Sequence, residues 1–196
     1  MGRGFTSEVR DAVLTIRFDR PEIRNPLSVS VLEDLSSTLD GGLDGIKAVI
    51  FTGTDNVFAS GADLREIAAV TSETAREFAL RGQTLMTRIS DLPQTTIAAI
   101  NGFCFGGALD LALACGHRIA SPNAKFAHPG AGLGIITGWG GTQRLPRLVG
   151  RGNALEMFFT AEAIDADQAL SIGLIDEIAD DPIKYAEEAI LETINN

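Results

Sequence analysis

The sequence predicts an α/β protein in which short apolar strands alternate with helices. Two apolar runs rich in β-branched residues, 12–18 and 47–53, flank a stretch at 28–40 whose apolar residues have helical spacing. The alternation continues to a last helix at 182–193, without a repeat or a low-complexity linker. A chain of 196 residues suits one sizeable core, so we expect a single domain over 1–196.

The expected elements can be placed in order along the chain. Ser28 stands just before the first helical stretch, where a serine hydroxyl accepts a hydrogen bond from the first turn. Glycine-rich turns at 58–67 and 101–112 each lead from a strand into a helix. We expect strands at 12–18, 47–53 and 95–100 and near 117–121 and 125–128, and helices at 28–40 and 74–90, from Gly107, and near 139–148, 151–160 and 182–193.

Composition excludes several classes of function. The chain has 16 Lys and Arg against 26 Asp and Glu, a net charge of -10, and no basic run, so we expect no nucleic-acid partner. Cys104 and Cys115, which we place near opposite ends of one helical run, have neither disulfide nor zinc spacing, so we expect a reducing compartment and no metal site. The N-terminal residues lack the apolar core of a secretion signal, and we expect a cytoplasmic protein.

One apolar stretch, 97–116, has to be weighed as a membrane span. Only Asn101 and Asp110 are strongly polar within it. The dipeptides Asn101-Gly102 and Gly106-Gly107 would break a helix, however, and a central aspartate costs roughly 2.5 to 3.5 kcal/mol on insertion scales. We therefore predict a buried strand, turn and helix here, and no contact with a membrane.

The turn before Gly107 is the first candidate functional feature. The first N–H groups of a helix have no partner within it and carry the positive end of its dipole, so the Gly107 N–H can face an oxygen that becomes negative during a reaction. Asp110 lies one turn further on the same helix face. It either acts on the same ligand or only complements the helix N-terminus. The sequence has no P-loop motif, and no GxGxxG opens a helix after a strand, so we expect no nucleotide site.

Five segments form a specific pattern in a fixed order. They are "RPEIRNPLS" (20–28), "FASGADLREI" (58–67), "AAINGFCFGGALDLALAC" (98–115), "GWGGTQRLPRLVG" (138–150) and "GLIDEIADD" (173–181). Together they resemble the enoyl-CoA hydratase/isomerase family, the crotonase superfamily. The resemblance implies a ClpP-like β-β-α spiral, one core domain with a truncated C-terminal helical region, and a homotrimer or hexamer. It also implies a coenzyme A thioester as the substrate, with no separate cofactor.

The resemblance assigns roles to residues of the glycine-rich turns. The backbone N–H groups of Ala62 and Gly107 would form an oxyanion hole around the thioester oxygen. Arg24 and Arg65 are the expected phosphate partners, although either can equally be a solvated surface charge. The residues expected to line the substrate path are Ile23, Arg24, Ser60, Gly61, Ala62, Asp63, Leu64, Arg65, Gly106, Gly107, Pro129 and Gly130.

Two departures from the family concern the reaction itself. Similar hydratases use two glutamates, and here those positions hold Asp110, whose side chain is shorter by one bond of about 1.5 Å, and Gly130, which has no carboxylate. His128 precedes Gly130 by two residues in a segment that we expect to be extended, so it would point to the same side and could act as acid or base. It can also be a buried, hydrogen-bonded histidine without a part in catalysis.

The residues leave three functions open. The favoured one is an enzyme of the enoyl-CoA hydratase/isomerase type, with Ala62 and Gly107 as oxyanion donors and Asp110 as acid/base. The absent second carboxylate favours a non-catalytic acyl-CoA-binding protein as an alternative. A CoA-thioester decarboxylase or hydrolase that uses His128 is the third.

Overall fold

The elements observed follow the expected alternation of strands and helices. A computed structural model describes residues 3–195, so residues 1, 2 and 196 of the domain expected over 1–196 lie outside it. The strands are β1 (Phe5–Arg10), β2 (Val13–Phe18), β3 (Pro26–Leu27), β4 (Ala48–Thr52), β5 (Val57–Ala59), β6 (Gly61–Ala62), β7 (Thr95–Ile100), β8 (Phe103–Phe105), β9 (His117–Ala120), β10 (Lys125–Ala127), β11 (Ile164–Asp165) and β12 (Glu177–Ile178). The helices are α1 (Val29–Asp40), α2 (Leu64–Ala68), α3 (Ala75–Ser90), α4 (Gly107–Ala114), α5 (Gly141–Thr160), α6 (Ala166–Ser171) and α7 (Pro182–Asn195), with short 3₁₀ helices η1 (Pro21–Ile23) and η2 (Pro129–Leu133).

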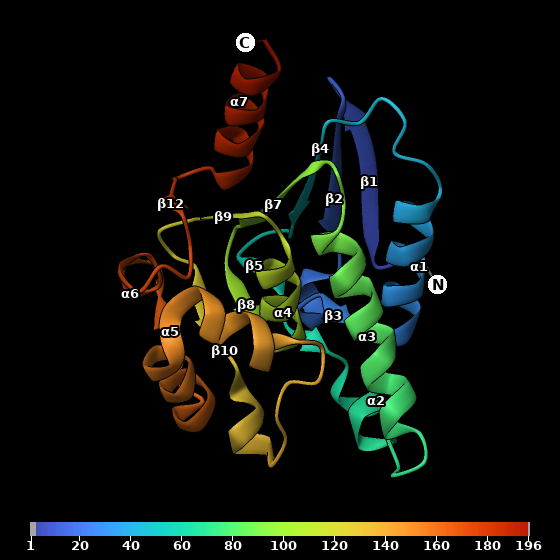
Figure 1. Cartoon of the computed structure of the whole chain (residues 1–196), viewed down its shortest axis with the longest axis vertical. Helices are drawn as coiled ribbons and strands as arrows, with labels where there is room; N and C mark the ends of the chain where they lie inside the picture. Colours follow the sequence, from blue (N-terminus) through green and yellow to red (C-terminus); the bar gives the residue numbers. More distant parts are fainter. Residues whose placement is uncertain (1–2, 196) are drawn as a thin grey trace.

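Successive β-β-α units wind into a spiral. The six-stranded sheet has the order β1-β2-β4-β7-β9-β12 and the four-stranded sheet the order β11-β10-β8-β5, while β3 pairs with β6. Each unit places its first strand in the larger sheet and its second in the smaller one: β4 and β5 lead to α2 and α3, β7 and β8 to α4, and β9 and β10 to α5. The predicted crotonase fold is therefore confirmed, and it brings the starts of α4 and α5 to one place (Figure 1).

The core lies on both faces of the larger sheet. One face packs against α1, α3 and α4, through side chains such as Ile16, Phe51 and Leu85. The other face is covered by α7, which packs Ala186 and Ile190 against it and stands at one end of the molecule (Figure 1). Burial on both faces explains why the central strands read as continuous apolar runs rather than alternating ones.

The sequence places most elements correctly but misses β1 and several short elements. Ser28 accepts a hydrogen bond from the Val31 N–H, as expected of an N-cap. The helices expected at 139–148 and 151–160 form α5, which is interrupted at Gly150 by non-helical backbone angles. Strands β1 and β8 were not predicted. Because β8 forms, the placement of the cysteines on one helical run was wrong: Cys104 lies in β8 and Cys115 follows α4.

The apolar stretch at 97–116 divides among β7, β8, α4 and the two residues between α4 and β9. Among residues 3–195, no helix combines the length and the apolar character that are needed to cross a bilayer.

Candidate active site

A cavity of about 440 Å³ lies where the start of α4, the end of β10 and the segment before α5 meet. Most of its wall is apolar, with side chains from α2, α3 and the 133–139 segment. The predicted residues that line it are Ser60, Ala62, Leu64, Gly106, Gly107, Asp110, His128, Pro129 and Gly130. Residues that lie up to 70 positions apart in the sequence therefore meet around one cavity, as a ligand site requires.

A second hollow, of about 710 Å³, continues from this cavity toward the surface. The two share Ser60, Ala62, Leu64, Pro129 and Leu133 in their walls. The second hollow also brings in the remaining predicted residues of the substrate path, namely Ile23, Arg24, Asp63 and Arg65. Of the predicted path, Gly61 alone lines neither hollow in the described part of the chain.

Gly61 instead allows β6 to touch the start of α4. It has a φ of +87°, a conformation that residues with a side chain rarely adopt. A Cβ at this position would lie 2.6 Å from the Gly107 nitrogen and 2.7 Å from the Phe105 oxygen. The backbone of Ala62, the next residue, is thereby held beside the first N–H of α4, for which helix geometry provides no acceptor within the helix.

Trp139, which was not predicted as a site residue, fixes this helix start from the other side. Its indole is buried and lines the cavity. A Cβ at Gly107 would overlap the six-membered part of the indole, and a Cβ at Gly82 of α3 would overlap its five-membered part. Phe78 packs on the same ring at a centroid distance of 6.0 Å. The ring is therefore wedged between α3 and α4, where two glycines make room for it.

Asp110 is fully buried on α4, one turn after Gly107. The Thr137 hydroxyl donates a hydrogen bond to its Oδ2 atom, whereas Oδ1 has no hydrogen-bond partner among the described residues. Burial raises the pKa of this carboxyl to about 7, because desolvation outweighs the Thr137 hydrogen bond, the positive charge of Arg144 and the effect of the nearby backbone N–H groups of Trp139 and Gly141. Asp110 is thus divided between its protonated and ionised forms near neutral pH.

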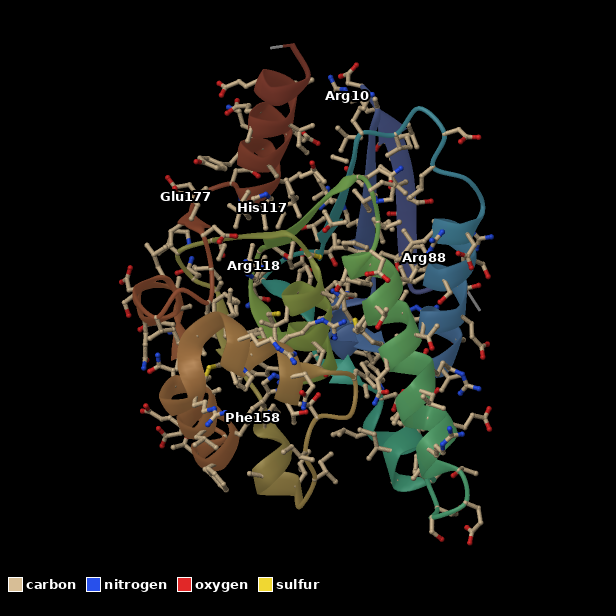
Figure 2. The ribbon with its side chains drawn as sticks, in the orientation of Figure 1. Arg10, Arg88, His117, Arg118, Phe158 and Glu177 are labelled. Carbon is tan, nitrogen blue, oxygen red and sulfur yellow. The ribbon has the colours of Figure 1, made fainter. Side chains whose placement is uncertain are left out.

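His128 lies directly opposite the free oxygen of Asp110. Its Nε2 atom is 3.7 Å from Asp110 Oδ1, and neither ring nitrogen has a hydrogen-bond partner among residues 3–195. The ring of Phe158, on α5, packs against the imidazole at a centroid distance of 5.1 Å; Figure 2 shows where Phe158 stands on this helix. Burial lowers the pKa of His128 to about 4, so the imidazole is neutral near pH 7. His128 is buried, as the alternative of a core histidine requires, but no described residue forms a hydrogen bond with its ring nitrogens.

Gly130 lies in a turn and not in the extended segment that the sequence suggested. The chain enters η2 at Pro129, because the fixed φ of proline suits the first position of a helical turn. Gly130 still lines the cavity, but a Cβ there would lie 2.6 Å from the Ile135 carbonyl oxygen. The Ile135 N–H also donates to the Gly130 carbonyl oxygen at 2.9 Å. This closed turn leaves no room for the second carboxylate of similar hydratases.

The two predicted phosphate partners lie at the rim of the outer hollow. Arg65 is exposed and forms an ion pair with Asp63, 2.6 Å between Nη2 and Oδ2. The same arginine, mainly through its side-chain hydrogen bond, lowers the pKa of Asp63, whose carboxylate caps α2. Arg24 follows η1 with a φ of +64°, and its carbonyl oxygen accepts a hydrogen bond from the Ser60 N–H.

Thr137, Trp139 and Phe158 are the site residues that the sequence did not reveal. The contacts of Thr137 and Phe158 depend on how α5 and its preceding segment fold over α4, which no local pattern encodes. For Trp139 there was one signal: Gly82 lies inside the predicted helix at 74–90, and a glycine inside a helix often marks the close approach of a neighbour.

The chain was compared with known proteins. A family model described as enoyl-CoA hydratase/isomerase matches residues 8–194. The crotonyl-CoA hydratase of Syntrophomonas wolfei is 39% identical over 174 residues, which cover 87% of this chain and 67% of that protein. The short-chain-enoyl-CoA hydratase of Clostridium acetobutylicum is 41% identical over 177 residues, or 88% and 67% of the two chains. The chain spans about two thirds of the length of these relatives.

Solved structures give a consistent result. The enoyl-CoA hydratase of Bacillus anthracis superposes with a TM-score of 0.92 at 35% identity, covering 98% of this chain and 77% of that one. DspI of Pseudomonas aeruginosa superposes with a TM-score of 0.93 at 34% identity, covering 100% and 82%.

Proposed function

We propose a hydration mechanism for this chain. The premise is that the chain belongs to the enoyl-CoA hydratase/isomerase family. It is an enzyme of the enoyl-CoA hydratase/isomerase type, which processes acyl-CoA thioesters. The finer proposal is that it adds water across the double bond of an enoyl thioester. The observation that favours it is the meeting of Asp110, His128 and the start of α4 at the wall of one apolar cavity.

The thioester carbonyl oxygen would lie between the N–H groups of Ala62 and Gly107. Attack of water on the β-carbon pushes electrons onto this oxygen, and the enolate that forms is stabilised by donors that are already in place. Removal of one such donor typically lowers a rate by roughly 100- to 1000-fold. Gly61 and Trp139 hold the two donors in position from opposite sides.

Asp110 would deliver the proton that the α-carbon receives. Its Oδ1 atom accepts no hydrogen bond from residues 3–195, and its raised pKa keeps a share of the carboxyl protonated near neutral pH. Coenzyme A would enter as part of the substrate, through the outer hollow that Arg24 and Arg65 border. A homotrimer or hexamer stays a prediction, which the exposed side chains of Leu155 and Phe159 on α5 favour.

This role of Asp110 predicts the pH dependence of hydration. An acid must be protonated to act, so the rate constant at saturating substrate should fall by about tenfold for each pH unit above the pKa. Because that pKa is raised to about 7, the fall should begin near neutral pH and not near pH 4. Stopped assays of 3-hydroxyacyl-CoA formation across this range would measure it, and a rate that stays constant up to pH 9 would contradict an acid role.

Assays with a panel of enoyl-, β-keto- and malonyl-type CoA thioesters test which reaction the protein catalyses. The purified protein should hydrate crotonyl-CoA, seen as loss of the absorbance of the conjugated thioester. Binding without turnover of any member would instead support an acyl-CoA-binding protein, and release of free CoA or carbon dioxide from β-keto- or malonyl-type thioesters would support a hydrolase or decarboxylase. Absence of acyl-CoA binding at millimolar concentration would contradict all three functions.

A further inference from the structure

Asp110 by itself does not provide both proton transfers that hydration needs. Hydration requires that one proton leave the attacking water while another reaches the α-carbon. Asp110 accounts for the second proton only. Gly130 carries no carboxylate, and the Ile135 carbonyl group occupies the space that a side chain at this position would need.

Two buried polar atoms without a hydrogen-bond partner among the described residues face each other here. They are Asp110 Oδ1 and His128 Nε2, and both residues line the cavity. Buried polar atoms are nearly always hydrogen-bonded in folded proteins, so this unpartnered pair indicates a place where a polar ligand binds. The 3.7 Å between Oδ1 and Nε2 is too long for a direct hydrogen bond, so the two groups do not satisfy each other.

We propose that His128 is the base that takes the proton from water and that it forms, with Asp110, a pair that restores itself after each turnover. This inference rests on the proposed hydration and adds a second catalytic residue to it. Thr137 orients the pair: by donating to Oδ2 it leaves Oδ1 of Asp110 facing the imidazole.

The protons and bonds balance over one cycle. The imidazole removes a proton from water as the oxygen bonds to the β-carbon, and the double bond shifts to form the enolate. The carboxyl of Asp110 then protonates the α-carbon, which gives the 3-hydroxyacyl thioester. The pair is now imidazolium and carboxylate, and transfer of a proton from His128 to Asp110 restores the starting state. No other reactant is needed.

The surroundings favour the neutral starting state of the pair. Phe158 shields the imidazole on one side, and both groups are withdrawn from solvent. The charged group that acts on Asp110 is Arg144, which favours the carboxylate, and the neighbouring Cys104 thiol is neutral because burial raises its pKa. Desolvation outweighs Arg144 and also keeps the imidazole unprotonated.

Two assays on one variant separate the roles of the two residues. In His128→Gln, hydration of crotonyl-CoA should fall by roughly 100-fold or more, the usual contribution of a positioned base. Exchange of the α-protons of butyryl-CoA with deuterium in D₂O should persist, because this reaction needs only the oxyanion hole and Asp110. Asp110→Asn should lose both activities. The matched control is His117→Gln at the exposed start of β9, far from Phe158 in Figure 2, and it should lose neither.

Each outcome bears on the proposal. Hydration at the wild-type rate in His128→Gln would overturn it. Loss of both hydration and exchange in a His128→Gln protein that still binds butyryl-CoA would also overturn it, because His128 would then act only by positioning Asp110. If the wild-type protein neither hydrates nor exchanges, the proposed function itself fails. Should His128→Gln not fold, nitrogen NMR of the wild-type imidazole decides: a base must be unprotonated at pH 6, and a protonated His128 at that pH would overturn the proposal.

Discussion

Replacement of Asp110 by asparagine is expected to lower the hydration of crotonyl-CoA by roughly 100- to 10,000-fold, the range that a positioned acid or base contributes. Asparagine has the same shape and can still accept the Thr137 hydrogen bond, but it has no acidic proton to give. Thioester binding should change little, because the oxyanion donors and the apolar wall stay in place. The measurements are steady-state hydration and calorimetry with a saturated acyl-CoA.

Asp167→Asn, on the exposed surface of α6, is the matched control and should keep full activity.

The thermal stability of the Asp110→Asn variant gives a second measurement. The folded-state pKa of Asp110 is raised from 3.8 to about 7, so its stabilising effect is complete below pH 3.8 and is lost as the pH rises through 7. The asparagine variant should therefore melt at a higher temperature than the wild type at pH 8, and the difference should shrink toward pH 4. Equal turnover in variant and wild type would reduce Asp110 to an acid that complements the start of α4.

The fold could be predicted because its signals are local. The buried runs of β4 and β7 and the capped helix α1 follow from residues adjacent in sequence and indicate an α/β protein, whereas the spiral was implied by the family resemblance. Strands of two or three residues, such as β8 and β12, carry too few residues for a period to be read, and their partners in the sheet decide them.

The site residues likewise differ in whether a local sequence pattern carries them. Ala62, Gly107 and Asp110 belong to short glycine-containing motifs, and the family resemblance that these motifs carry implied their roles. Thr137 reaches Asp110 across 27 positions, and Phe158 reaches His128 across 30, through the way α5 folds back over α4. For Gly130 the expected extended backbone was wrong, because Pro129 starts a 3₁₀ turn that the alternation of strands and helices does not reveal.

Substitution of Gly107 by alanine is expected to lower hydration strongly. It tests the position of an oxyanion donor, because alanine keeps the backbone N–H. The added Cβ would overlap the indole of Trp139, which is held by α3 on its far side, so either the ring or the start of α4 must move. Such overpacking typically destabilises a protein by about 1 to 3 kcal/mol. A shift of about 1 Å in a catalytic group can cost roughly 100-fold in rate, and we expect a loss of hydration of this size.

The control for this change is Gly152→Ala, in the exposed second half of α5, where a Cβ would meet no atom within 4 Å. It should leave activity unchanged and raise stability slightly, because alanine favours a helix over glycine. The double variant Gly107→Ala with Trp139→Phe removes the overlapping part of the ring and should recover part of the lost rate. Melting temperatures and α-proton exchange of butyryl-CoA should accompany the hydration assay, since a displaced donor slows enolate formation in both reactions. If Gly107→Ala alone keeps the wild-type rate and melting temperature, the indole does not fix the start of α4, and Trp139 has no part in positioning the oxyanion hole.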